Sequence, residues 1–225
     1  MMYFLIPLCL LIAAVFIYME KQEKYVIAVI LKGLASLCFV ALGMMASKGN
    51  STSGTIVAGL LLGCIADVLL NLRYVFKTKG QLVFLAGIVV FLSGHIAYLM
   101  AVMPMSSNPL LCVAAAVVLT ALLMKWIFSR IEAKKAFKIF GIVYIGAIVL
   151  LNVTAAGNVA ADPDTFNVIF AIGALLFLVS DIVLILNTFG PEPKFIFRVT
   201  NLSLYYIGQI LIALSLLFLR CYLCC

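Results

Sequence analysis

Residues 59–70 read Gly-Leu-Leu-Leu-Gly-Cys-Ile-Ala-Asp-Val-Leu-Leu, an apolar stretch in which Asp67 is the charged side chain. The stretch belongs to an apolar run of about 20 residues, the length that an α-helix needs to cross roughly 30 Å of hydrocarbon. A transmembrane β-barrel would instead show segments of about 10 residues with alternating hydrophobicity. The run therefore predicts a membrane-spanning helix that carries a carboxylate.

The composition of the whole chain supports the same class of protein. Of the 225 residues, 67% are hydrophobic and 10% are charged, whereas an ordinary soluble domain is about 45–50% apolar and about 25% charged. This excludes a soluble globular domain and a disordered chain. We predict an all-α polytopic membrane protein, forming a single integral membrane domain over 1–225. Its eight predicted spans are 2–19, 25–46, 54–72, 81–103, 108–128, 137–156, 166–188 and 199–220.

The basic residues predict the orientation of the chain. The net charge is +7, but the basic side chains lie in short loops that face lipid headgroups, so no nucleic-acid partner is expected. The loops after spans 1, 3, 5 and 7 hold 12 Lys and Arg residues, against 2 on the opposite side. The positive-inside rule then predicts cytoplasmic odd-numbered loops and both termini outside, in the cytoplasmic membrane if the protein is bacterial.

The chain also contains an internal similarity. Residues 173–184 read Gly-Ala-Leu-Leu-Phe-Leu-Val-Ser-Asp-Ile-Val-Leu and align with 59–70, so that Asp181 matches Asp67 at an offset of 114. The same offset places Gly94 on Gly208 without a gap. These matches predict a parallel 4+4 repeat, with possible repeats 1–110 and 115–225. In such a repeat Asp67 and Asp181 would face one another at one depth.

Polar side chains inside the spans indicate a functional site. A carboxylate near a helix centre costs about 2.5–3.5 kcal/mol on insertion scales, so such residues normally face the protein interior or a wet cavity. Several of them share the predicted cytoplasmic half of the membrane, which predicts one site open to that side. Simpler interpretations stay open: Lys32 could form a structural ion pair, and His95 could be an interhelical hydrogen-bonding residue. The intramembrane polar residues that indicate the site are Lys32, Ser36, Asp67, Asn71, His95, Asp181, Asn187 and Asn201.

Five short motifs together resemble the YhhN family of eight-span membrane proteins, which includes the lysoplasmalogenases. Gly33 stands where the family's first motif has proline, and Ala66 where the second more usually has glycine. The motifs are Ile30-Leu-Lys-Gly-Leu34, Leu62-Gly-Cys-Ile-Ala-Asp67, Phe91-Leu-Ser-Gly-His-Ile-Ala-Tyr98, Val179-Ser-Asp181 and Tyr206-Ile-Gly-Gln209.

The resemblance implies hydrolysis of the vinyl ether bond of lysoplasmalogens, a class of lysophospholipid. The products are a fatty aldehyde and glycerophosphoethanolamine or glycerophosphocholine. No cofactor and no metal are expected, and the expected partners are the substrate and the membrane lipids. The candidate catalytic residues are Asp67, Asp181 and His95, and the candidate substrate-binding residues are Lys32, Ser36, Asn71, Tyr98, Asn201, Tyr206 and Gln209.

These residue types suit vinyl ether hydrolysis. A vinyl ether has no carbonyl to attack, so a nucleophilic serine or cysteine is unnecessary. Protonation of the outer alkene carbon produces an oxocarbenium ion, to which water adds, and the hemiacetal then collapses to the aldehyde. The reaction needs a neutral acid and an ionised partner. Two facing aspartates can share one proton in this way, because two like charges in a desolvated site repel each other. Lys32 could bind the substrate phosphate as a point charge.

Two other functions remain open at this stage. Parallel repeats with ionisable residues at their interface are also typical of carriers, so a proton-coupled transporter of a small molecule or lipid is the main alternative. A metal-dependent hydrolase would use Asp67, His95 and Asp181 around zinc. The chain has 1 histidine, which leaves few ligands for such a site.

Overall fold

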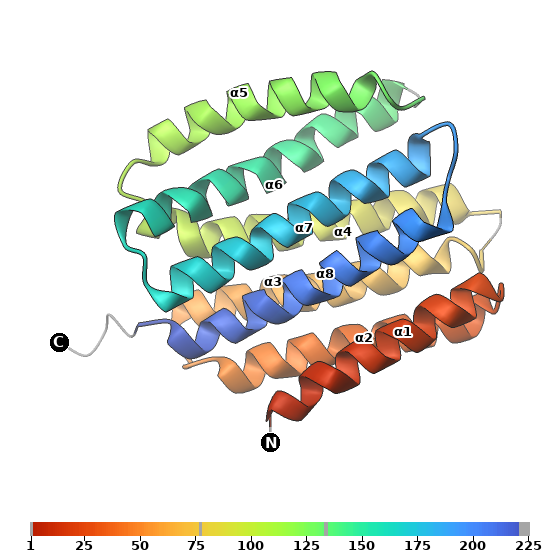
Figure 1. Ribbon diagram of the computed structural model, residues 1–225, viewed down its shortest axis with the longest axis horizontal. Coiled ribbons are helices and arrows are strands. Elements are labelled where there is room, and N and C mark those ends of the chain that lie inside the picture. The colour runs from red at the N-terminus through yellow and green to blue at the C-terminus, as the bar shows by residue number, and fades with distance from the viewer. Residues whose placement is uncertain (1, 77, 133–134, 221–225) are drawn as a thin grey trace. The chain divides into compact units, whose positions relative to one another are not determined.

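The computed structural model describes residues 2–76, 78–132 and 135–220, and this part of the chain is helical and contains no strand (Figure 1). Each of its 8 long helices is apolar enough to cross a membrane. The predicted fold class, an all-α polytopic membrane protein, is confirmed. The helices are α1 Leu5–Lys21, α2 Tyr25–Ala46, α3 Ser51–Leu72, α4 Gly80–Val102, α5 Pro109–Phe128, α6 Lys135–Ala161, α7 Thr165–Phe189 and α8 Phe195–Ser215.

Three predicted span ends are wrong by more than a helical turn. Helix α6 continues to Ala161 instead of ending at 156, and α8 extends from Phe195 to Ser215 instead of from 199 to 220. Polar residues such as Asn158 lower the apparent hydropathy near the end of α6, but Asn158 is buried and its side chain donates to the Val102 carbonyl at 3.0 Å. The helix continues to the residue before the Asp162-Pro163 pair, since proline disfavours helix in the preceding residue.

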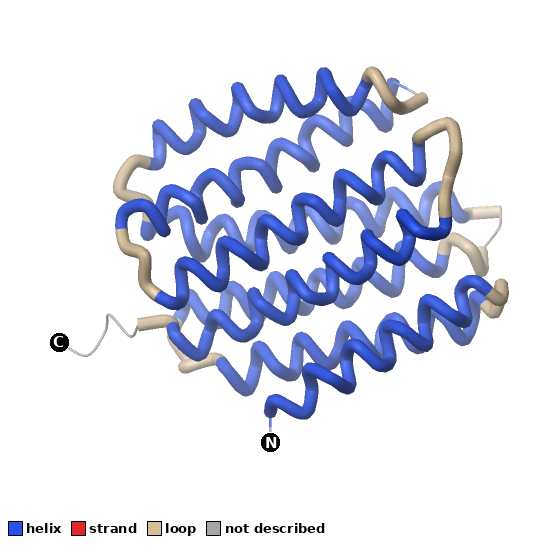
Figure 2. The backbone as a smooth tube through the Cα atoms, in the orientation of Figure 1, coloured by secondary structure: helices blue, strands red, loops and turns tan. Residues whose placement is uncertain are grey.

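Helix α3 also begins earlier than predicted, at Ser51 instead of 54. Asn50 caps the helix, because its side-chain oxygen accepts a hydrogen bond from the Ser53 amide at 2.8 Å. The cap satisfies one of the amides that have no partner within the first turn. Figure 2 shows the short loops that remain between the helices.

The chain divides into two compact units, each described here by itself. Unit 1 is Met1–Tyr98 together with Ala213–Cys225, and unit 2 is Leu99–Ile212. In unit 1, α1 packs on α2 and α2 on α3; in unit 2, α5 packs on α6 and α6 on α7. The unit boundaries lie within α4 and α8 and so differ from the predicted repeat boundaries at 110 and 115. Each unit is built mainly from four consecutive helices.

Pairs of glycines bring the third and fourth helix of each unit close together. In unit 1 a Cβ at Gly94 would lie 3.2 Å from the Gly59 carbonyl oxygen. In unit 2 a Cβ at Gly208 would lie 2.9 Å from the Gly173 carbonyl oxygen. Small residues allow helix backbones in membranes to approach closely, which strengthens their van der Waals packing. Glycine at these positions therefore sets the packing of α4 on α3 and of α8 on α7.

The glycine pairs lie at the offset of 114 that the sequence similarity predicts. The helix caps repeat at the same offset: Asp164 caps α7 by accepting from the Asn167 amide at 2.8 Å, as Asn50 caps α3. Both caps use a side-chain oxygen and the amide three residues later. These correspondences favour the internal duplication, which stays a prediction.

The glycine contact in unit 1 leads to a stability prediction. Gly59→Ala is expected to destabilise the protein by about 1–3 kcal/mol, the usual cost of overpacking, because the new Cβ would overlap the buried Tyr98 ring. Gly54→Ala on the same helix is the control, since nothing lies within 4 Å of a Cβ there. Thermal unfolding in detergent measures both variants, and equal melting temperatures would contradict the packing role.

The orientation of unit 1 can also be tested. Lys48 donates to the Leu219 carbonyl at 2.8 Å, so the α2–α3 loop and the end of the described chain lie on the same side. The positive-inside rule predicts that this side is outside. In a cysteine-free background, a membrane-impermeant maleimide is expected to label Ser51→Cys in intact cells and to spare Thr78→Cys, beyond the other end of α3. The reverse pattern would invert the predicted orientation.

Candidate functional site

Unit 1 contains a buried ion pair. The Lys32 ammonium on α2 lies 3.0 Å from Asp67 Oδ1 on α3. The second carboxylate oxygen, Oδ2, accepts a hydrogen bond from the Ser36 hydroxyl at 2.6 Å. Lys32 is 3% exposed and Asp67 1%. The lysine and the serine are one helical turn apart on α2, so one face of this helix holds both oxygens of the carboxylate.

Two further side chains extend this cluster. The Lys32 ammonium also donates to Asn71 Oδ1 at 3.4 Å, and the Asn71 amide donates to Glu20 Oε2 at 2.9 Å. Asn71 lies one turn after Asp67 on α3, and Glu20 lies in the last turn of α1. The cluster therefore joins three helices near the α1–α2 loop, on the side that the charge distribution predicts to be cytoplasmic. Its charged groups are one ammonium and two carboxylates.

The second aspartate lies in unit 2 and has different neighbours. Asp181 on α7 accepts a hydrogen bond from the Tyr144 hydroxyl on α6, with 2.5 Å between the oxygens. Next to Asp181, Ser180 and Asn201 join α7 to α8: the Asn201 amide donates to the Ser180 hydroxyl at 2.7 Å and to its carbonyl at 2.9 Å. This hydrogen bonding anchors the helix segment that carries Asp181 on both sides. The arrangement of Asp181 face to face with Asp67 stays a prediction.

An aromatic group lies one to two turns further along α8. The Tyr205 ring packs edge-on against Phe177 of α7 at 5.3 Å and against Tyr206 at 5.1 Å. The Gln209 amide donates to the Tyr205 hydroxyl at 3.5 Å. Tyrosines near the end of a span usually anchor the membrane interface, but both rings are at most 4% exposed. Tyr205 and Tyr206 therefore lie in the interior.

Two more candidates lie on α4 in unit 1. His95 is 1% exposed and Tyr98 2%, and their rings are 6.3 Å apart between centroids. Tyr98 packs against Gly59 of α3. The position of His95 after Gly94 thus places it beside a close contact between α4 and α3. A role in orienting the aspartates stays a prediction.

Every candidate residue is buried. The catalytic and substrate-binding candidates are between 0% and 4% exposed, as expected for polar residues that face a protein interior instead of lipid. Within unit 1 the structure brings Lys32, Ser36, Asp67 and Asn71 into contact. Among the described residues, no group of three or more His, Cys, Asp or Glu side chains is placed to hold a metal ion. The terminal Cys221, Cys224 and Cys225 lie outside the described residues.

The YhhN family model matches residues 27–216. The chain belongs to the YhhN family. The match extends from α2 to the end of α8 and includes the ion pair of unit 1 and the aspartate of unit 2. Comparison with curated proteins and with solved structures finds no match.

Three polar residues of this YhhN-family chain were not predicted from the sequence. Glu20 resembles a loop charge next to Lys21, but α1 continues through it. Tyr144 and Ser180 lie inside apolar runs, where tyrosine and serine are common without a polar role. The signal for Ser180 was its place beside the intramembrane Asp181. Tyr144 had no comparable signal, because its hydrogen bond to Asp181 depends on the packing of α6 against α7.

Proposed function

We propose that the protein hydrolyses the vinyl ether bond of lysoplasmalogens, as the family resemblance implies, and releases a fatty aldehyde and a glycerophosphoethanolamine or glycerophosphocholine. The observation that carries the proposal is the buried cluster around Asp67, whose carboxylate is held by Lys32 at 3.0 Å and by Ser36 at 2.6 Å. This is a preorganised acidic group inside an apolar protein. Asp67 lies in the segment that the YhhN family model matches. Hydrolysis by such a group requires no nucleophilic serine or cysteine.

The two aspartates receive different roles because their neighbours differ. Asp67 forms an ion pair with Lys32, which suits the ionised partner that stabilises the oxocarbenium ion and orients the attacking water. Because Lys32 holds Asp67 in its ionised form, we assign the delivery of the proton to the outer alkene carbon to Asp181, which Tyr144 orients through a hydrogen bond. His95 and Tyr98 orient the pair or relay protons in this proposal. The substrate enters from the cytoplasmic side.

The roles of the remaining candidates follow from the same proposal. The Lys32 ammonium contacts both the substrate phosphate and the Asp67 carboxylate. The Asn71 side chain holds the ammonium between these two groups. Asn201, Tyr206 and Gln209 line the path of the substrate in unit 2. Ser36 keeps the Asp67 carboxylate in one orientation. The apolar spans accommodate the alkenyl chain.

Incubation of the purified protein with a lysoplasmalogen tests the activity. We expect long-chain aldehyde to appear by mass spectrometry, with none formed from the lysophospholipid that carries the same chain as an ester. The reaction in D₂O, with the aldehyde trapped by reduction, is expected to place one deuterium on the carbon next to the former carbonyl, because this carbon receives the catalytic proton. Lysoplasmalogen uptake into sealed vesicles without aldehyde formation would contradict the proposal and favour the carrier.

A further inference from the structure

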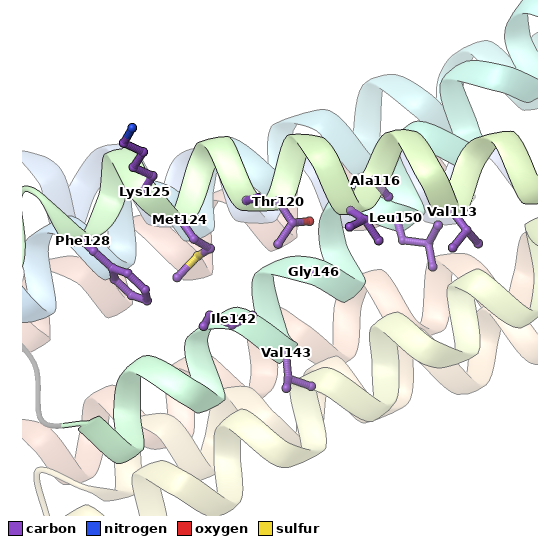
Figure 3. A pocket seen from close by; sticks show the side chains of 12 residues that line it. Val113, Ala116, Thr120, Met124, Lys125, Phe128, Ile142, Val143, Gly146 and Leu150 are labelled. Atoms are coloured by element: carbon purple, nitrogen blue, oxygen red, sulfur yellow. The ribbon is translucent and has the colours of Figure 1, made fainter.

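Unit 2 contains a groove between α5 and α6 that takes no part in the clusters described above. Its volume is about 620 Å³, within the range of small-molecule sites. The α5 wall includes Thr120 and Met124, and the α6 wall includes Val143 and Gly146. Figure 3 shows these walls facing each other along both helices. The groove opens outward, since Val117 on its rim is 64% exposed.

The groove has one charged end. Lys125 lies at the end near Phe128, and its ammonium points away from α6 (Figure 3). Lys138 lies at the same end, with its ammonium 5.4 Å from the centre of the Phe128 ring. Within the described part of the chain, Lys125 forms no ion pair with an acidic side chain. This end is therefore positively charged and available to an anion.

The length of the groove fits a lipid chain. Lining residues on α5 extend from Val113 to Phe128, a helical distance of about 22 Å at 1.5 Å per residue. One leaflet of hydrocarbon is about half of the roughly 30 Å bilayer core, so a groove of this length extends beyond one leaflet and accommodates a full acyl chain. The walls are almost entirely apolar, and Gly146 leaves room in the floor beside Thr120. An extended acyl chain that starts at the charged end would lie along the whole groove.

We propose that this groove binds one acyl chain of an anionic glycerophospholipid, with the lipid phosphate against Lys125. The site goes beyond the proposed hydrolase activity and does not depend on it. Charge complementarity decides the occupant: a basic end next to an apolar groove matches an acidic headgroup on an apolar chain. Lys125 lies at the C-terminal end of α5, on the predicted cytoplasmic side, where membranes carry their anionic lipids.

Native mass spectrometry of the purified protein in detergent tests the site. Dioleoyl phosphatidylglycerol and dioleoyl phosphatidylcholine are added at equal concentrations. We expect the complex with one phosphatidylglycerol to exceed that with phosphatidylcholine by about fivefold, the effect of one lysine on an anionic lipid near the membrane surface. Equal binding of the two lipids by the unmodified protein would overturn the proposal.

Two pairs of variants locate the site. Lys125→Met is expected to abolish the preference for phosphatidylglycerol, whereas Lys125→Arg keeps it. Ala121→Phe places a ring in the groove and is expected to weaken binding of both lipids, whereas Leu122→Phe, on the adjacent lipid-facing position that is 61% exposed, leaves it unchanged. An unchanged preference in Lys125→Met, or equal effects of the two phenylalanine variants, would place the lipid elsewhere.

Trp126 supplies an independent readout, because it is the 1 tryptophan of the chain and follows Lys125. In phosphatidylcholine vesicles, a small fraction of phosphatidylglycerol with brominated acyl chains is expected to quench its fluorescence more than the same fraction of brominated phosphatidylcholine. Lys125→Met should make the two lipids equal. A mass spectrum dominated by a lipid-free dimer would instead assign the groove to a second copy of the chain and overturn the proposal.

Discussion

Asp67→Asn and Asp181→Asn are each expected to remain folded and to lose about 10²–10⁴-fold in kcat for aldehyde release, the usual contribution of one acid–base group. Asparagine keeps the size of the side chain and an oxygen that can still accept hydrogen bonds from Lys32, Ser36 or Tyr144. It removes the ability to ionise and to hold a transferable proton. A purely hydrogen-bonding role would survive this exchange, whereas Asp67→Asn also removes the charge that pairs with Lys32 and is expected to lower stability. Steady-state kinetics on lysoplasmalogen, with unfolding measured in parallel, checks the prediction.

The double variant adds a test of whether the two aspartates act as a unit. Its kcat is expected to be little lower than that of the worse single variant, since residues that act together are strongly non-additive. The pH dependence of kcat is expected to be bell-shaped, because the pair works with one proton bound. Asp162→Asn, in the α6–α7 loop, is the matched control and should keep its activity. Near-normal turnover in either intramembrane variant would remove that residue from the mechanism.

Lys32→Met is expected to cause the second large effect, on stability. The substitution leaves the Asp67 carboxylate, which is 1% exposed, without the ammonium that lies 3.0 Å away. Breaking a buried ion pair from one side typically costs about 3–5 kcal/mol, because the remaining charge is uncompensated. Denaturant or thermal unfolding in detergent measures the loss. A variant as stable as the parent would show that the ion pair does not support the fold.

A second variant separates the structural role of Lys32 from its proposed role in binding. Lys32→Met combined with Asp67→Leu removes both charges and is expected to recover much of the lost stability. In the single Lys32→Met variant, contact with the substrate phosphate predicts a rise in KM that exceeds any fall in kcat, since the contact exists in both the ground and transition states. A fall in kcat at constant KM would instead assign Lys32 to positioning Asp67.

The fold could be predicted from the sequence to a large extent because lipid imposes a simple rule. A backbone in hydrocarbon must satisfy its own hydrogen bonds, so each apolar run of about 20 residues becomes a helix. The number of helices and most of their ends follow from this rule. It fails at the end of α6 and at both ends of α8, because hydropathy measures side chains, whereas capping residues and prolines decide where a helix begins or ends. Pro163 decides the end of α6 in this way, and Asn50 decides the start of α3.

The candidate site was predictable only in part. The cost of a charge in the membrane identified Lys32, Asp67 and Asp181 from the sequence. Lys32 lies next to Asp67 in the structure because helical spacing brings both residues to the contact between α2 and α3. Glu20 and Tyr144 were not predictable, because their significance comes from the neighbouring helix that each contacts. The apolar groove between α5 and α6 was not predictable for the same reason, although the sequence placed the lysines at its charged end against lipid headgroups.

The sequence by itself determined the class of protein, its helices and the identity of the intramembrane charged residues, because these depend on the transfer of side chains and backbone from water to lipid. The tertiary structure alone decided the ion pair of Lys32 with Asp67. It also decided the hydrogen bonds from Tyr144 to Asp181 and from Asn71 to Glu20. Partners of this kind come from different helices. Which of them meet depends on how the glycine contacts and side-chain packing rotate each helix against its neighbours, and this rotation is a property of the packed units.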